Sequence, residues 1–159
     1  MVAWNKIVRF IASIIICQLA GIIGSFFTSS SISTWYVGIA KPSFNPPNWV
    51  FAPVWTALFI LMGVSLYFVW VKGFKAKGVK TGLLLFSIQL ILNIFWSVFF
   101  FGLQNPLIAF IEIIVLWIAI LLTILKFYKV SRTAAYLLIP YLLWVSFAAI
   151  LNLAILVLN

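Results

Sequence analysis

Long apolar stretches alternate with short polar ones along this sequence. A helix needs about 20 mostly apolar residues to cross the hydrocarbon core of a bilayer. Five stretches reach that length, and none shows the ten-residue alternation of a lipid-facing β-strand. We therefore predict an all-α membrane protein, a bundle of five transmembrane helices with a long structured first loop. The expected spans are approximately residues 7–27, 49–71, 81–101, 106–128 and 133–157.

The breaks between these stretches carry the chemistry of turns. Five of the seven residues 72–78 are Lys or Gly, and residues 129–132 begin with Lys129 and end with Arg132. Residues 102–106 form a short turn that ends in Pro106, a residue suited to the first turn of a helix. Since no break is long enough for a soluble domain, residues 1–159 are predicted to form a single transmembrane domain.

The cations fall almost entirely on one side of the five predicted spans. Nine of the ten Lys and Arg residues lie in the N-terminal segment and in the second and fourth loops, while the other side holds only Lys41. Because cytoplasmic loops of membrane proteins are rich in Lys and Arg, we predict a cytoplasmic N-terminus and an external C-terminus. The net charge of +9 is thus interpreted as a topology signal, with no nucleic-acid partner expected.

Composition excludes several classes of protein. With 67% hydrophobic and 7% charged residues, the chain cannot be a water-soluble globule or a disordered segment. A single cysteine, Cys17, excludes a disulfide framework, and the absence of histidine excludes the usual His-based zinc, haem and Ser-His-Asp sites. We expect an integral membrane protein of a bacterial or archaeal cell membrane.

The first loop, residues 29–48, differs from the others. It is about 20 residues long and contains three prolines, which restrict the backbone, together with Trp35, Tyr36 and Phe44. A stiff aromatic segment at the membrane face is typical of a lid. The alternative is a belt of interfacial aromatic residues, for which Trp and Tyr are well suited.

Polar and aromatic residues share faces in two of the spans. Spacings of three and four residues bring each set to one side of its helix: Gln89, Asn93 and Trp96 in the third span, and Tyr141, Trp144, Ala148 and Asn152 in the fifth. Side-chain amides without hydrogen-bond partners are costly in hydrocarbon, so the Gln and Asn side chains should point into the bundle. They serve either as hydrogen-bonding contacts between helices or as directional groups in an aromatic pocket.

Other residues allow predictions about charge pairing, the start of one helix and the packing between helices. Glu112 is the only acidic residue, and it should either pair with Lys41 or remain protonated. Asn48 is a candidate N-cap of the second span, and Pro53 should make that helix kink or begin late. Small residues at four-residue spacing in the first span suit close helix packing, within the chain or in a dimer: Ala20, Gly24 and Thr28.

Three segments together resemble the TspO/MBR family of tryptophan-rich sensory proteins and translocator proteins. The strongest is Trp35-Tyr36 followed by KPSFNPPNWVFAPVW at residues 41–55. The others are QLILNIFW at residues 89–96 and LIPYLLW at residues 138–144. The resemblance covers nearly the whole chain. It implies a five-helix bundle, often a homodimer, with a ligand pocket under the first loop.

The family resemblance also implies a ligand and the residues that bind it. The ligand would be a porphyrin such as protoporphyrin IX, or another flat hydrophobic molecule, with no cofactor required and no metal. Carried over by motif, the ligand-binding residues would be Ser25, Thr28, Trp35, Tyr36, Trp49, Phe51, Ala52, Trp55, Asn93, Trp96, Trp144, Ala148 and Leu151.

We interpret the chain as a membrane receptor or sensor for tetrapyrroles. Flat porphyrin rings can stack on indoles, and Lys41 and the indole N–H groups could hold the propionates. The alternatives are light-dependent porphyrin degradation and transport of tetrapyrroles or sterols. No acid–base pair supports ordinary catalysis. The sterol-recognition pattern of animal relatives needs a Tyr and a basic residue, and residues 152–159 contain neither.

Overall fold

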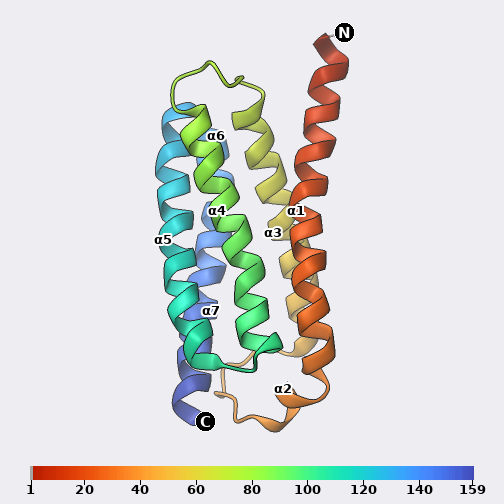
Figure 1. Cartoon of the computed structure of the whole chain (residues 1–159), viewed down its shortest axis with the longest axis vertical. Coiled ribbons are helices and arrows are strands. Elements are labelled where there is room, and N and C mark those ends of the chain that lie inside the picture. Colours follow the sequence, from red (N-terminus) through yellow and green to blue (C-terminus); the bar gives the residue numbers. More distant parts are fainter. Residues whose placement is uncertain (1) are drawn as a thin grey trace.

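A computed structural model describes residues 2–159 and shows long helices running up and down, joined by short connections (Figure 1). Within those residues, five helical segments are long and apolar enough to cross a membrane, so the predicted all-α, five-span architecture is confirmed. The elements are α1 (Val2–Ile32), α2 (Trp35–Gly38), α3 (Asn48–Trp70), α4 (Val79–Ser97), the π-helical turn η1 (Val98–Gly102), α5 (Pro106–Val130), α6 (Arg132–Leu137) and α7 (Ile139–Leu158).

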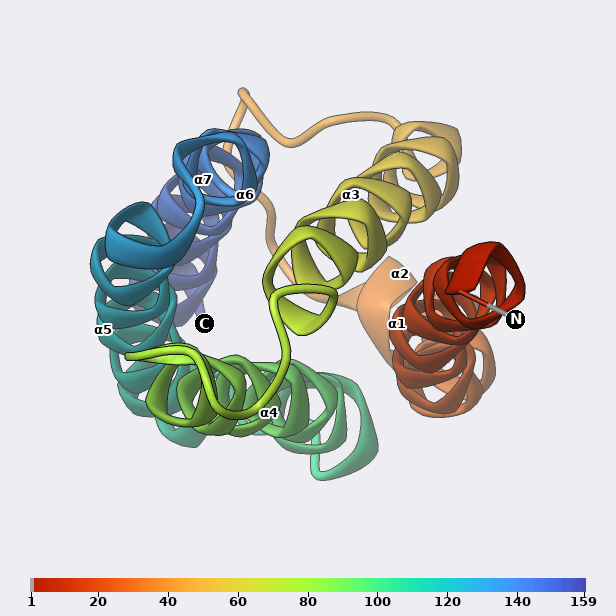
Figure 2. The same cartoon turned by 90° about the horizontal axis from the view of Figure 1, so that it is seen from above.

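Seen along the bundle, the helices are arranged in a ring (Figure 2). Contacts run from α1 to α4, from α4 to α5, from α5 to the α6–α7 pair, and from that pair through α3 back to α1. Since each helix satisfies its own backbone hydrogen bonds, only side chains need to fill the interior.

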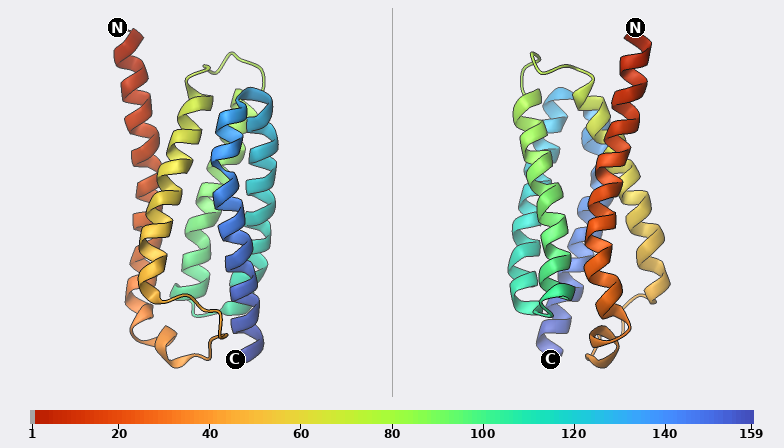
Figure 3. Two further views of the ribbon diagram at one scale, coloured as in Figure 1. Left: turned by 180° about the vertical axis from the view of Figure 1, so that it is seen from behind. Right: turned by 45° about the vertical axis from the view of Figure 1, so that its right-hand side comes forward.

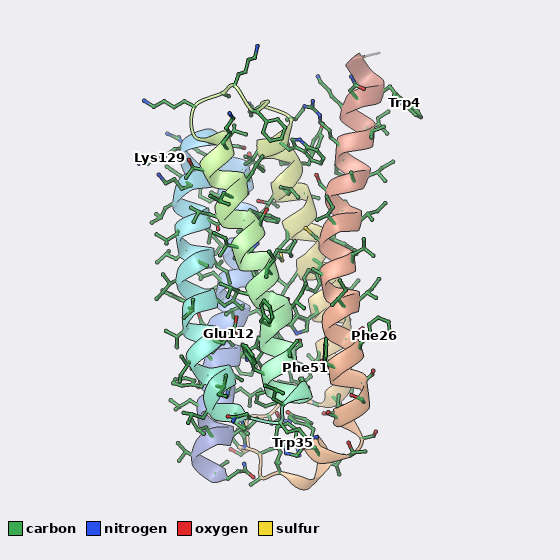
Figure 4. The ribbon with its side chains drawn as sticks, viewed as in Figure 1. Trp4, Phe26, Trp35, Phe51, Glu112 and Lys129 are labelled. Atoms are coloured by element: carbon green, nitrogen blue, oxygen red, sulfur yellow. The ribbon has the colours of Figure 1, made fainter. Side chains whose placement is uncertain are left out.

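The two ends of the bundle differ in charge. The N-terminus, the α3–α4 loop and the α5–α6 junction lie at one end, and α2, the α4–α5 turn and the C-terminus lie at the other (Figure 1). The segments with nine cations therefore share the first end, marked by Lys129 in Figure 4, whereas Lys41 lies at the second.

The helices differ from the predicted spans at three places. α1 continues to Ile32, so the first part of the expected loop is helical. The third span ends in the π-helical turn, where the Leu103 N–H donates to the Val98 carbonyl at 2.7 Å. The fifth span is broken at Leu138, because Pro140 has no N–H and its ring would clash with the carbonyl of Tyr136.

The start of α3 corrects a prediction. Asn48 is the first helical residue, Pro47 holds the N-cap position, and no side chain caps the helix. The helix begins five residues before Pro53, so a late start is also wrong. The predicted role of Pro106 is confirmed: it lies in the first turn of α5, where Asn105 Oδ1 accepts the Ile108 N–H at 3.0 Å.

Two groups of buried side chains make up the core. The larger one lies among the long helices and includes the stacked rings of Phe86 and Phe127, 5.7 Å apart. The smaller one lies at the end where the C-terminus lies, and it brings Tyr36 from α2 onto Phe100 and Phe101 of η1. A cavity remains between these two groups.

Candidate functional site

The cavity lies inside the bundle at the C-terminal end, between α1, α3, α4 with η1, and α7, with α2 across it. Its volume is about 370 Å³, within the usual range for small-molecule sites. The lining residues are Gln18, Ala20, Gly21, Ile22, Gly24, Ser25, Thr28, Ile32, Tyr36, Asn48, Phe51, Ala52, Trp55, Thr56, Phe59, Asn93, Trp96, Ser97, Phe100, Phe101, Trp144, Ala148, Leu151, Asn152 and Ile155.

Aromatic rings line several sides of the cavity. On the α4 side, Trp96 stacks on Phe100, with ring centroids 5.0 Å apart and 17° between the planes. On the α3 side, Trp55 stacks on Phe59 at 5.6 Å. Such stacked pairs hold broad, flat, apolar surfaces in fixed orientations. The wall therefore suits a planar hydrophobic ligand.

Polar side chains around the cavity join its helices, and one of them holds the Trp96 ring. The Asn93 Nδ2 donates to the Tyr141 hydroxyl at 3.0 Å. The indole N–H of Trp96 donates to Asn152 Oδ1 at 3.2 Å, and Asn152 Nδ2 donates to the Pro106 carbonyl at 2.9 Å. The two alternatives for these amides are thus combined: Asn93 and Asn152 join helices and line the cavity.

Gln89, on the same predicted face as Asn93, behaves differently. It is buried, is not among the lining residues, and neither side-chain polar atom has a hydrogen-bond partner among the described residues. It therefore contributes neither to the cavity nor to a hydrogen bond between helices.

Residues 33–47, which we call the lid, close the cavity at the membrane face. Tyr36 is only 4% exposed, lines the cavity, and donates its hydroxyl hydrogen to Asn45 Oδ1 at 2.8 Å. Burial raises the pKa of this hydroxyl above its ordinary value. Because Trp35 and Tyr36 pack inward on Phe100, the structure favours a lid over an interfacial belt.

Eleven of the thirteen predicted site residues line the cavity: Ser25, Thr28, Tyr36, Phe51, Ala52, Trp55, Asn93, Trp96, Trp144, Ala148 and Leu151. They come from α1, α2, α3, α4 and α7, so the fold brings together residues that lie far apart in the sequence.

The two remaining residues, Trp35 and Trp49, do not line the cavity. Trp35 packs behind it, edge-on to Phe100 at 5.5 Å. Trp49 is 74% exposed, because it precedes the cavity-lining Phe51 by two residues and is rotated about 200° from it around α3. Figure 4 shows Trp35 and Phe51 at the lid end of the bundle.

Sequence reasoning missed several lining residues. Phe59 follows Trp55 by four residues, and Gln18 precedes Ser25 by seven, so helical spacing could have placed both on the cavity side. Phe100 follows Trp96 by four residues and could have been placed in the same way. Phe101 lies in the π-helical turn, whose backbone departs from the 3.6-residue repeat on which the spacing rule depends.

The predicted pairing of Glu112 with Lys41 is wrong. Lys41 Nζ donates to the carbonyl of Ile39 at 3.1 Å and lies 4.7 Å from the centre of the Tyr36 ring. Glu112 is buried in α5, and neither carboxyl oxygen has a hydrogen-bond partner among the described residues. It is not among the cavity-lining residues either.

The small residues of α1 pack within the chain. A Cβ atom on Gly21 would lie 2.5 Å from the Phe59 ring, and one on Gly24 would lie 3.1 Å from Ser97 Oγ. Ala20 is buried and lines the cavity. This face therefore serves the close packing of α1 on α3 and α4.

A five-helix membrane bundle with an aromatic cavity beneath a proline-rich lid defines the structural class of this protein. Comparison with known proteins identifies its family. Residues 13–158 match the model of the TspO/MBR family, and the chain belongs to that family. The match confirms the resemblance that the three sequence motifs indicate.

Similar proteins come from bacteria, archaea and animals. The chain is 51% identical to the tryptophan-rich protein TspO of Chlorobaculum tepidum over 144 residues, 91% of each chain. It is 49% identical to the tryptophan-rich protein TspO of Archaeoglobus fulgidus over 155 residues, 97% of this chain and 99% of that one. It is 39% identical to the human translocator protein over 137 residues, 85% of this chain and 80% of that one.

Proposed function

We propose that this protein is a membrane receptor or sensor that binds a porphyrin, such as protoporphyrin IX, or a similar flat hydrophobic molecule in the cavity. The observation that carries the proposal is the cavity wall, where indoles from α3, α4 and α7 face one apolar space under the lid. A porphyrin offers large aromatic faces for such rings.

The polar edge of the ligand would lie at the lid end of the cavity. Ser25, Thr28 and Asn48 line the cavity near the ends of their helices that meet the lid. Porphyrin propionates would lie there, close to the water. The expected partners Lys41 and the Trp96 indole are already engaged, Lys41 with the Ile39 carbonyl and Trp96 with Asn152.

The proposed orientation places the N-terminus in the cytoplasm and the C-terminus outside. It is supported by the nine cations at the N-terminal end of the bundle against Lys41 at the other. The lid would then lie at the external face of the membrane, with the cavity beneath it.

Binding is tested by titrating reconstituted protein with protoporphyrin IX and following tryptophan fluorescence. We expect saturable quenching, and Trp144→Ala should weaken binding roughly tenfold because an aromatic contact is lost. Trp49→Phe is the matched control, since Trp49 lies outside the cavity. Quenching without saturation, or equal loss in both variants, would refute the proposal.

The family names "sensory" and "translocator" point to two uses of bound ligand. Counterflow of porphyrin in proteoliposomes would identify transport. Illumination of the complex would identify degradation if a new absorption band appears with the wild-type protein and is absent from variants that lack the cavity tryptophans. Sensing predicts neither result.

A further inference from the structure

Among the residues that the structure describes, the cavity lining is exposed on one side. Its exposed lining residues all belong to two helices: Ile22 and Ser25 of α1, and Asn48, Ala52 and Thr56 of α3. The lining residues of α4, η1 and α7 are buried or half-buried. The cavity is therefore open between α1 and α3 and enclosed elsewhere by the bundle and the lid.

The crossing of α1 and α3 explains this opening. The helices touch in the half nearer the N-terminus, where a Cβ atom on Gly63 would lie 2.8 Å from the Ile14 Cα. Farther along, Gln18 Nε2 donates to the Thr56 carbonyl at 3.2 Å. Beyond that bond the two helices separate toward the lid end (Figure 3, right). We call this gap, bounded by Ile22, Ser25, Ala52 and Thr56, the side opening.

The side opening faces hydrocarbon. Its four bounding residues lie within the membrane-spanning segments of α1 and α3. The two hydroxyl groups are satisfied inside their own helices, Ser25 Oγ on the Ile22 carbonyl at 2.7 Å and Thr56 Oγ1 on the Ala52 carbonyl at 2.8 Å. The rim thus presents mainly carbon atoms, which suit contact with acyl chains rather than with water.

The lid, in contrast, is held closed by hydrogen bonds and a cation–π contact. Tyr36 donates to Asn45 at 2.8 Å, and the Lys41 ammonium group lies over the Tyr36 ring. Asn159, which directly follows α7, holds the backbone of Ala40 through two hydrogen bonds of 3.0 and 3.1 Å. A ligand passing through the lid would have to break several such contacts. Among the described residues, the side opening is crossed by one hydrogen bond, Gln18–Thr56, at its inner end.

We propose that the ligand reaches the cavity sideways from the bilayer, through the side opening, while the lid stays closed. The inference rests on the proposed function. It defines the ligand class more closely: a flat molecule that first dissolves in the membrane, with its apolar ring among the acyl chains and its polar edge at the headgroups. In the cavity that edge lies near Asn48.

The route is tested by the rates of binding. Protoporphyrin IX is loaded into vesicles that contain the protein, and association and dissociation are followed by stopped-flow fluorescence. Ile22→Trp narrows the side opening and should slow both rates roughly tenfold, with a dissociation constant that changes far less, because a gate affects passage in both directions. Thr56→Trp narrows the opposite rim and should act in the same way.

Two controls separate the side opening from other effects. Ile15→Trp adds the same side chain to an exposed position of α1 that does not line the cavity, and should leave both rates unchanged. Asn159→Ala loosens the lid and should also leave them unchanged. Each variant is checked for native helix content and a single gel-filtration peak before kinetics.

Two results would overturn the inference about the entry route, and they have different consequences for the proposed function. Faster exchange in Asn159→Ala, with wild-type rates in both rim variants, would place the route through the lid and leave the proposed function standing. No saturable uptake by the wild-type protein would refute the proposed function itself, and the route with it.

Discussion

Asn159 holds Ala40 by both of its backbone polar groups. Its Oδ1 accepts the Ala40 N–H at 3.0 Å, and its Nδ2 donates to the Ala40 carbonyl at 3.1 Å. The same Nδ2 also donates to the Ile155 carbonyl at 2.8 Å. The end of α7 is thereby joined to the lid, 119 positions away in the sequence.

Removing this contact should loosen the lid. Asn159→Ala deletes two hydrogen bonds to the lid, which together contribute about 1–2 kcal/mol. Amide hydrogen exchange in residues 39–47 should therefore speed up roughly 5- to 30-fold. Val157→Ala, at an exposed position of the same helix end, is the control. Unchanged protection of the lid in Asn159→Ala would contradict the prediction.

The Tyr36–Asn45 bond should make the lid sensitive to alkaline pH. Burial raises the pKa of Tyr36 above its ordinary value of 10.0, and ionised tyrosine cannot donate to Asn45. The stabilisation is fully present below the unfolded pKa and is lost as pH rises through the higher pKa of the closed lid. Lid hydrogen exchange should increase over that interval, and Tyr36→Phe should remove this pH dependence.

The Asn93–Tyr141 hydrogen bond joins α4 to α7 beside the cavity. A double-mutant cycle with Asn93→Leu and Tyr141→Phe should give a coupling energy of about 0.6–1.7 kcal/mol, the range for such bonds in membrane proteins. Unfolding in mixed detergent micelles measures it. Each single variant should be less stable than wild type, because it leaves a buried polar group without its partner. Strictly additive effects would show that the two side chains do not interact.

The spans could be predicted because bilayer thickness and backbone hydrogen bonding leave few alternatives for long apolar stretches. Spacing also placed Asn93 and Trp96 on one face correctly, since a regular helix repeats every 3.6 residues. The small-residue face of α1 had two interpretations, and only the close approach of Gly21 to Phe59 decides for packing within the chain.

Sequence reasoning failed where a contact depends on how deep a residue lies in the bundle, or where a side-chain direction depends on an irregular backbone. Glu112 and Lys41 were expected to pair because both lie toward one side, but Lys41 has nearer partners in its own loop. The signature containing both Trp49 and Phe51 does not show which of them faces inward. The orientation of Phe101 depends on a π-helical turn that no spacing rule contains.

The proposed orientation is tested by labelling the termini. Single cysteines added at the N- and C-termini should react with a membrane-impermeant thiol reagent from opposite sides, the C-terminal one in intact cells and the N-terminal one in inverted vesicles. Native Cys17 is fully buried and should give no background. The reverse labelling pattern would refute the orientation and leave the five-span fold intact.

Glu112 should be dispensable for ligand binding. It does not line the cavity, so Glu112→Gln should leave porphyrin affinity within about twofold of wild type, a small change in binding free energy. Its carboxyl group is buried without a hydrogen-bond partner, which costs free energy, so Glu112→Leu should raise stability by about 1–3 kcal/mol. Thermal unfolding and the porphyrin titration measure the two effects separately. A large loss of affinity in Glu112→Gln with unchanged stability would mean that the carboxyl group acts on the bound ligand, and would favour proton-coupled transport over sensing.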